Sequence, residues 1–309
     1  MTKRLGIGTL VNVDAPLADV VAELGSYAEA GLDHAFATQI FGPDALTLLA
    51  VAGSHVPGIT LGTGVVPVHP RHPMVLAQQA LTVQWATGNR LVLGIGLSHQ
   101  VVVEGMWGLR YDKPATYMKE YLAALLPLLR GETVTSTGER VTMNAFVPLD
   151  VAKAPGIEPP PVLVAALGPA MLKLAGTVAD GTVTWMTGTK TIGDHVAPSI
   201  VTAAEAAGRS APRVVVALPI AVTEDADKAR ERIAEAFAVY PNLPSYRAML
   251  DREGAADATD IAFVGDEEVV AAAIGRLADA GATDFVAAVV GDRAERERGL
   301  ALLSQLARG

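Results

Sequence analysis

The chain of 309 residues contains no cysteine and is poor in aromatic and charged side chains. Without cysteine it cannot form disulfides, thiolate zinc sites, iron–sulfur clusters or thiol nucleophiles. Aromatic residues make up 5% of the chain and charged residues 18%, whereas about 25% of a typical globular chain is charged. So few charged side chains predict a compact body rather than an extended or disordered one.

The chain also has fewer basic than acidic residues. The chain has 24 Lys and Arg against 33 Asp and Glu, a formal net charge of −9. This balance argues against a nucleic-acid surface, which needs clustered cations to displace counterions from phosphates. It does not exclude an anionic small-molecule cofactor, because a few N–H groups and one or two cations can hold a phosphate.

Long apolar runs are missing as well. No run approaches the roughly 18 residues of a membrane span, and residues 1–10 lack the apolar core of a signal peptide. We therefore expect a cytoplasmic protein without a membrane segment.

What the sequence does contain is an alternation of two patterns. Short runs rich in Val, Ile and Leu, without a polar face, are typical of parallel strands that are buried on both sides. These runs are 5–11, 34–38, 59–66, 91–97, 161–167, 182–186, 213–222 and 283–290. Segments with helical spacing follow them, often opened by Pro or Asp and closed by Gly. They are 15–30, 43–53, 73–87, 114–130, 169–179, 192–207, 225–240, 266–280 and 294–307.

Eight strand–helix units predict an α/β fold of the (β/α)8 TIM-barrel type, in one domain spanning 1–309. Insertions at about 110–160 and 241–262 are expected on the C-terminal face of the barrel, where they would shape the site. The structural alternative is a doubly wound open sheet. Its glycine fingerprint is incomplete here, because His99 stands where GIGLSH would need a third Gly.

Polar residues at the predicted strand ends are the candidates for chemistry. Gln39, Ser98, His99, Gly168 and Trp185 would all face one mouth of a barrel, which is otherwise lined by Gly, Val, Ala and Leu. Such a lining suits a flat, largely apolar ring and suits paired-carboxylate hydrolysis poorly. Trp107 lies in a lid-like segment, EGMWG, where it could cover a substrate.

Structural interpretations stay open for each of these residues. His99 could only cap the next segment, and Trp185 could be barrel packing. His69 and His72 flank prolines and are expected to fix a loop and a helix start, and no ligand spacing indicates a metal site. Ser98 and His99 are adjacent, so they do not form a Ser–His hydrolase pair.

Several motifs in order resemble the bacterial luciferase-like flavin and deazaflavin oxidoreductases. They are DALT at 44–47, LGTGVVP at 61–67, RHPMVLAQQA at 71–80, GNRLVLGIG at 88–96, ALGP at 166–169, LAG at 174–176 and ADG at 179–181. GLSH at 96–99 with MWG at 106–108 is most similar to the branch that uses coenzyme F420.

The resemblance implies a TIM barrel, a homodimer and a cofactor site at the mouth. It places a cis peptide at Gly64–Val65, against the deazaflavin ring, and the anionic tail at the turn after the fifth strand. The cofactor-binding residues it implies are Gly64, Val65, Val66, Gly96, Ser98, Ala166, Leu167, Gly168, Pro169 and Trp185. We expect Arg71 to help Gly168 hold the tail.

Two positions depart from the family pattern. Many relatives carry Asp–His after the second strand, where this chain has Gln39–Ile40, and some sugar-phosphate-oxidising relatives carry an acid where this chain has His99. Both changes count against sugar-phosphate oxidation. They leave His99 as the proton-transfer candidate, Gln39 as an orienting residue and Trp107 as a substrate contact.

The leading hypothesis is an F420-dependent oxidoreductase that passes a hydride between the deazaflavin and a small organic substrate. One alternative is an FMN-dependent monooxygenase of the same fold. Another is a non-catalytic protein that binds a flavin or deazaflavin. The substrate and the direction of transfer do not follow from the sequence.

Overall fold

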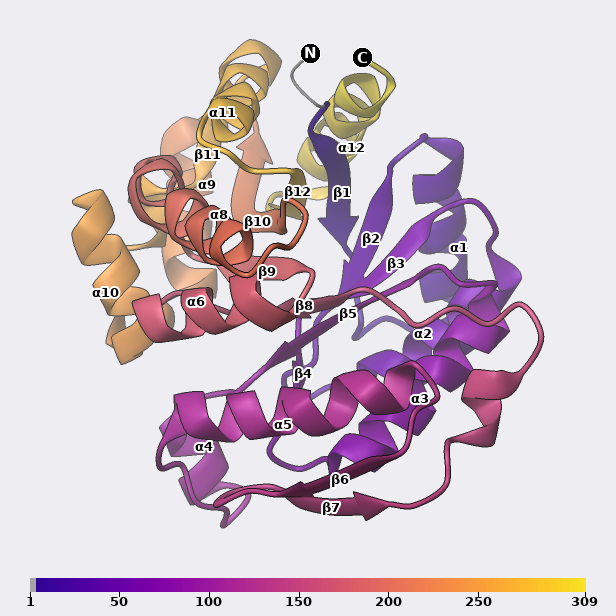
Figure 1. Ribbon diagram of the computed structural model, residues 1–309. Helices are drawn as coiled ribbons and strands as arrows, with labels where there is room; N and C mark the ends of the chain where they lie inside the picture. Colours follow the sequence, from indigo (N-terminus) through magenta and orange to yellow (C-terminus); the bar gives the residue numbers. More distant parts are fainter. Residues whose placement is uncertain (1–3) are drawn as a thin grey trace.

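The computed structural model describes residues 4–309. Residues 1–3, the start of the segment without a signal-peptide core, lie outside this range. Within it, eight parallel strands form a closed barrel (Figure 1). They are β1 (Gly6–Leu10), β2 (His34–Ala37), β3 (Thr60–Thr63), β5 (Leu91–Gly96), β8 (Val162–Val164), β9 (Gly181–Trp185), β10 (Arg213–Val222) and β12 (Asp284–Val289).

Strand pairing runs around the whole barrel. β1 pairs with β2 on one side and with β12 on the other, and β10 pairs with both β9 and β12. No edge is left in the ring, so the open-sheet alternative is wrong and the predicted (β/α)8 barrel is confirmed.

Helices cover the outside of the barrel (Figure 1). Several begin where a side chain accepts a backbone N–H of the first turn, as Asp44, Asp266 and Asp292 do. The covering helices are α1 (Leu17–Glu29), α2 (Ala45–His55), α3 (Pro73–Thr87), α5 (Pro114–Leu129), α6 (Pro169–Val178), α8 (Ala197–Ala206), α9 (Ala226–Ala236), α11 (Glu267–Asp279) and α12 (Arg293–Arg308).

Two predicted strands differ from the structure. The run 59–66 is split into β3 and β4 (Val66–Pro67), and the cis peptide Gly64–Val65 lies between them. The run 161–167 forms a strand only over Val162–Val164, because the N–H of Ala166 turns away to the Thr182 hydroxyl at 3.3 Å.

Two predicted helices also differ. The helix predicted over 192–207 opens with a π turn, Ile192–Val196, before α8 begins, and the one predicted over 225–240 ends at Ala236. A short 3-10 turn, Tyr240–Asn242, follows α9.

The short helix α4 (Gln100–Gly105) precedes the first insertion, which contains α5 and an antiparallel hairpin, β6 (Val134–Thr137) with β7 (Thr142–Ala145). The hairpin lies alongside α5 rather than across the mouth (Figure 1). Glu120 of α5 accepts the backbone N–H groups of Glu139, Arg140 and Val141 at its tip, at 3.0, 2.7 and 2.9 Å. Only the hairpin tip therefore reaches the end of α5 that lies on the C-terminal face. A 3-10 turn, Asp150–Lys153, follows the hairpin.

The second insertion lies on the C-terminal face, as expected. It contains α10 (Pro244–Glu253) and the turn Ala258–Asp260. β11 (Phe263–Gly265) follows the insertion and pairs in parallel with the C-terminal end of β10, through Val222↔Gly265. The carboxylate of Glu253 accepts the N–H groups of Lys190 and Thr191 at 3.0 and 2.7 Å. These two residues belong to α7 (Thr189–Thr191), directly after β9, so the insertion is anchored beside the mouth.

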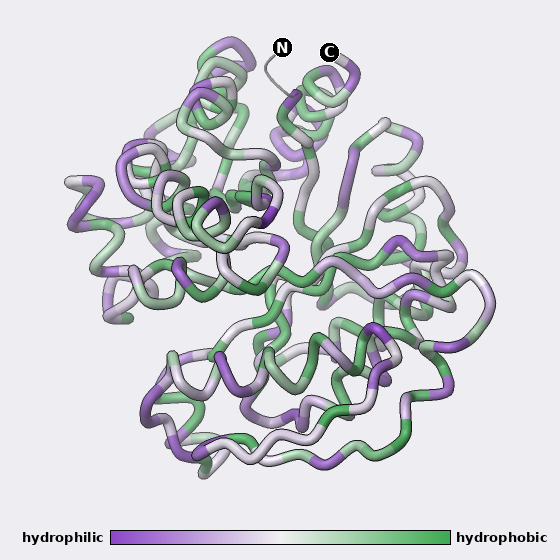
Figure 2. Tube along the Cα trace, in the orientation of Figure 1, coloured by the Kyte–Doolittle hydropathy of each residue, from purple (hydrophilic) through white to green (hydrophobic). Residues whose placement is uncertain are grey.

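Hydrophobic segments run along the barrel strands, while hydrophilic segments concentrate in the surrounding helices and loops (Figure 2). Among residues 4–309, no helix is both long and apolar enough to span a membrane.

Candidate active site

The C-terminal ends of the strands meet over an apolar floor. Inside the barrel, buried side chains from six strands form one cluster, and Leu10, Val65 and Trp185 pack against it. The cluster comprises Phe36, Val92, Leu163, Val183, Val215, Ala217 and Val286. A flat, apolar group could lie on this surface without burying an unpaired charge.

The cis peptide Gly64–Val65 lies at the edge of this floor, as the family resemblance implies. The N–H of Gly64 donates to the carbonyl of Ala37 at 2.9 Å. The side chain of Val65 fills the space above Gly96, where an added Cβ would lie 2.7 Å from Val65 Cγ2. The structure therefore brings Gly64, Val65 and Gly96 together, with Val66 buried beside them.

Ser98 and His99 follow β5 at the mouth. Ser98 has a positive φ of 61°, and its carbonyl accepts the hydroxyl of Tyr111 at 3.5 Å. His99 stands at the start of α4, with its ring centroid 5.4 Å from that of Tyr246. Burial lowers the pKa of the His99 imidazole.

Aromatic side chains from the end of α9 to α10 form a wall beside Trp185 that the sequence did not predict. Trp185 lies edge-on to Phe237 and Tyr240, with centroids 5.4 and 5.7 Å away, and Tyr240 lies 5.1 Å from Tyr246. Burial raises the pKa of both tyrosines, so their hydroxyls stay protonated and can donate hydrogen bonds. Phe237, Tyr240 and Tyr246 are a local concentration in a chain that is 5% aromatic, and that signal could have found them.

The turn between β8 and α6 presents unused donors. Gly168 is the N-cap of α6 and Pro169 its first residue. Within residues 4–309, the N–H groups of Leu167, Gly168, Ala170 and Met171 donate to no other group. Four free N–H groups at a helix start can bind an anion, and this turn includes Gly168 and Pro169 of the predicted segment Ala166–Pro169.

The expectation that Arg71 assists this turn is wrong. The Arg71 guanidinium pairs with Asp44 at the start of α2. It thus points toward the loop after β2, whereas Gly168 follows β8, on the other side of β5.

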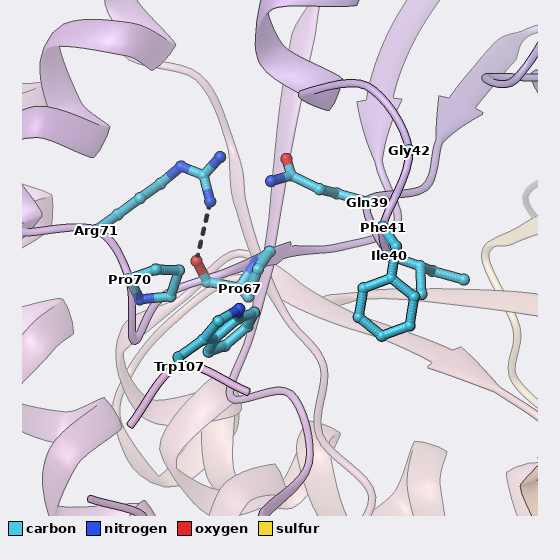
Figure 3. A pocket seen from close by; sticks show the side chains of 8 residues that line it. All are labelled: Gln39, Ile40, Phe41, Gly42, Pro67, Pro70, Arg71 and Trp107. Carbon is cyan, nitrogen blue, oxygen red and sulfur yellow. Dashed lines mark hydrogen bonds between the residues drawn. The ribbon is translucent and has the colours of Figure 1, made fainter. Parts of the chain in front are cut away.

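A cavity of about 520 Å³ opens beside the floor (Figure 3). It brings together Gln39 and Trp107, two of the predicted site residues, whereas His99 lies outside the set that lines it. The lining residues are Gln39, Ile40, Phe41, Gly42, Pro67, Pro70, Arg71 and Trp107.

The histidines considered for a metal serve other purposes. His72 Nδ1 accepts the N–H of Met74 at 3.3 Å and so caps α3, while His69 stacks on Tyr117 with centroids 4.4 Å apart. No group of three or more His, Cys, Asp or Glu that could hold a metal ion occurs in the described part of the chain.

Comparisons with known proteins agree with this geometry. A family model described as luciferase-like monooxygenase matches residues 4–296. A Mycobacterium tuberculosis protein named as a coenzyme F420-dependent oxidoreductase is 36% identical over 170 residues, covering 52% of this chain. The match spans about half of that relative, 49% of its length.

Two archaeal proteins match over more of the chain. The 5,10-methylenetetrahydromethanopterin reductase of Methanolobus tindarius is 29% identical over 231 residues, which cover 72% of this chain and 68% of that protein. The solved structure of the coenzyme F420-dependent tetrahydromethanopterin reductase of Methanopyrus kandleri superposes with a TM-score of 0.81 at 24% identity, over 98% of both chains. This superposition supports the barrel fold.

Proposed function

Since the chain belongs to the luciferase-like monooxygenase family, we propose that it is a coenzyme F420-dependent oxidoreductase acting on a small organic substrate. F420, when bound, supplies a deazaflavin carbon that accepts or donates a hydride. The chain supplies position, exclusion of water and the movement of a proton. We further propose a homodimer located in the cytoplasm.

The observation that carries the proposal is the pairing of an apolar floor with an anion site on the same barrel mouth. The floor of Val65 and Trp185 fits a flat ring, and the free N–H groups around Gly168 fit an anionic tail. The chain has a net charge of −9, which as a whole repels an anionic cofactor. Free N–H groups and a helix dipole can still hold the anion at this turn without a cation.

The residues around the floor have separate roles in this proposal. His99 exchanges a proton with the substrate, and Gln39 orients the substrate from the adjoining cavity. Tyr246, which faces the His99 ring, adds a second hydroxyl donor on that side. Trp107 covers the cavity from the lid side.

Parallel titrations with F420 and FMN test the cofactor. We expect the intrinsic fluorescence of F420 to change on binding, and F420 to bind at least tenfold more tightly than FMN. Tighter binding of FMN would instead support the luciferase-like monooxygenase alternative. Binding of F420 without turnover on a panel of enones, imines and alcohols would support the non-catalytic alternative.

A matched pair of variants tests the anion site. An added Cβ at Gly168 meets no atom within 4 Å, so both Gly168→Asp and Gly168→Asn fit and can cap α6. The aspartate repels an anionic tail, so we expect Gly168→Asp to bind F420 about tenfold more weakly than Gly168→Asn. Equal affinities of the two variants would contradict a tail at this turn.

A further inference from the structure

The cavity that contains Gln39 adjoins the floor. Pro67, in its lining, lies two residues after the Gly64–Val65 peptide, and Gln39 lies two residues after Ala37, which accepts the N–H of Gly64. Under the proposed function, a substrate in this cavity would lie beside the deazaflavin ring. The chemistry of the lining therefore indicates which substrates can bind.

The charge of Arg71 is cancelled inside the cavity. Arg71 is the one charged residue in the lining, and its side chain is 12% exposed. Its guanidinium pairs with the carboxylate of Asp44. It also donates to the carbonyl of Pro67 at 3.4 Å (Figure 3). A second carboxylate entering the cavity would meet the negative charge of Asp44 as well as the cation.

Asp44 is held in its ionised form. Burial opposes ionisation, but the hydrogen bonds from the N–H and hydroxyl of Thr47 and the charge of Arg71 lower the pKa of the Asp44 carboxyl. The bonds from the Thr47 N–H and hydroxyl are both 2.8 Å long. The pair therefore stays neutral as a whole near pH 7.

Gln39 presents a donor rather than an acceptor. Its Oε1 accepts the N–H of Ala45 at 3.1 Å, which fixes the orientation of the amide because an N–H cannot donate to Nε2. The amide nitrogen then points into the space between Gln39 and Arg71 (Figure 3). A ligand that reaches Gln39 is best recognised through a hydrogen-bond acceptor.

The rest of the cavity is apolar. Ile40 and Phe41 are 60% and 67% exposed at its rim, and Pro67, Pro70 and Trp107 form the walls. A cavity of about 520 Å³ is within the range of small-molecule sites. Apolar walls, with donors only from the Gln39 amide and the charge-paired Arg71 guanidinium, favour burial of an uncharged ring or chain that carries an acceptor.

Resting on the proposed function, we propose that the substrate is an uncharged, largely apolar carbonyl compound whose oxygen accepts a hydrogen bond from Gln39. In the same proposal Asp44 is a specificity-determining residue. By neutralising Arg71, it excludes substrates that carry a carboxylate or phosphate.

Two isosteric ketones test this selectivity. The probes are 3-oxocyclohexanecarboxamide and 3-oxocyclohexanecarboxylate, which have the same ring and the same ketone but differ in charge. Their dissociation constants are measured by ligand-observed NMR with and without F420, so the readout does not require turnover. We expect the wild-type protein to bind the carboxamide at least tenfold more tightly.

The Asp44→Asn variant supplies the decisive comparison. Asn retains an oxygen that can cap α2 but frees the charge of Arg71. We expect the ratio of carboxamide to carboxylate affinity to fall by about tenfold in Asp44→Asn.

The Arg71→Gln variant tests the proposal if Asp44→Asn does not fold. It leaves the carboxylate of Asp44 unpaired, so the ratio of carboxamide to carboxylate affinity should rise. Gln39→Leu should weaken both ketones alike.

Equal binding of the two probes to the wild-type protein, or an unchanged ratio in a folded Asp44→Asn variant, would overturn the inference. The cofactor proposal is judged separately. If the cavity is selective but the protein does not bind F420, the inference is supported and the cofactor proposal is overturned. If the protein binds F420 but the cavity is not selective, the cofactor proposal is supported and the inference is overturned.

Discussion

His99 and His34 lie at opposite ends of the barrel, and burial lowers the pKa of both imidazoles. His99 stands at the C-terminal mouth beside Tyr246. His34 begins β2 at the other end, where its Nε2 lies 3.2 Å from the carbonyl of Phe285. The same physical effect thus has two consequences, one for catalysis and one for stability.

For His99 we expect a pH-dependent rate. Because burial keeps the imidazole neutral near pH 7, the proton-donating form grows as the pH falls below 6.5. The rate of substrate reduction should rise over that interval and level off below the lowered pKa. Steady-state kinetics of His99→Ala should show roughly a 10²-fold loss and no such rise.

His55→Ala is the control for this series, because His55 is exposed at the end of α2, away from the mouth. It should retain the pH dependence of the wild-type protein. If His99→Ala keeps full turnover with bound cofactor, His99 does not exchange a proton with the substrate.

For His34 we expect a pH-dependent stability. Its folded pKa is below that of the unfolded chain, so the stabilisation is complete above about pH 6.5 and is lost as the pH falls toward the folded pKa. The slope approaches about 1.4 kcal/mol per pH unit for one proton. Denaturant unfolding between pH 5 and 7.5 should show a flatter dependence in His34→Gln.

The exposed His55→Gln variant is the matched control for this measurement, and it should keep the wild-type slope. An unchanged slope in His34→Gln would show that other groups cause the acid sensitivity. Asp284 is one such group, because bonding to Arg213 outweighs burial and lowers the pKa of its carboxyl.

At the scale of elements, α10 depends on one carboxylate for its position. Glu253 accepts two N–H groups at α7, and an added Cβ on Gly188 would lie 2.3 Å from its carboxyl carbon. The missing side chain of Gly188 is therefore what allows this close approach. α10 also carries Tyr246, so the anchor fixes the wall opposite His99.

We expect Glu253→Ala to loosen α10, since the two N–H groups lose their acceptor. Hydrogen exchange of residues 244–253 should become faster, and KM for the substrate should rise several-fold. Glu253→Gln, which can accept only through one oxygen, should give a smaller effect. Glu235→Ala on the exposed side of α9 should change neither quantity, and equal exchange rates in Glu253→Ala would contradict the anchoring role.

At the scale of the whole molecule, α2 and α3 carry an exposed apolar surface. These neighbouring helices expose Val51, Val75 and Trp85, by 40%, 47% and 66%. Exposed large apolar side chains on neighbouring helices are candidates for an interaction surface in soluble proteins. We propose this surface as the contact between the two copies of a homodimer.

Trp85→Glu should therefore yield a monomer with an intact circular-dichroism spectrum, because two buried carboxylates would face each other across a two-fold interface. Light scattering coupled to size exclusion measures the outcome. Val269→Glu places the same charge at an exposed apolar position on α11 and should leave the mass unchanged. If the Trp85→Glu variant remains a dimer, the interface does not include the exposed surface of α2 and α3.

The order of eight strands and their helices could be predicted from the sequence alone. Strands buried on both faces must be nearly continuous apolar runs, and helix ends carry local signals such as Asp44 and Gly88. Val65, Trp185 and the turn at Gly168 could be singled out from the sequence, because each belongs to a short segment at a strand end. The buried floor residues inside the strands, such as Phe36 and Val215, could not, because nothing local distinguishes them from other core residues.

Only the tertiary structure decided the contacts between distant segments. The pairing of Arg71 with Asp44, the wall of Tyr240 and Tyr246 opposite His99, and the path of the hairpin along α5 each join residues far apart in the chain. No local pattern encodes such a contact, because it forms only when barrel closure brings the loops to one face. The sequence by itself therefore determined the barrel and the place of its mouth, and tertiary packing determined the charge and the walls of that mouth.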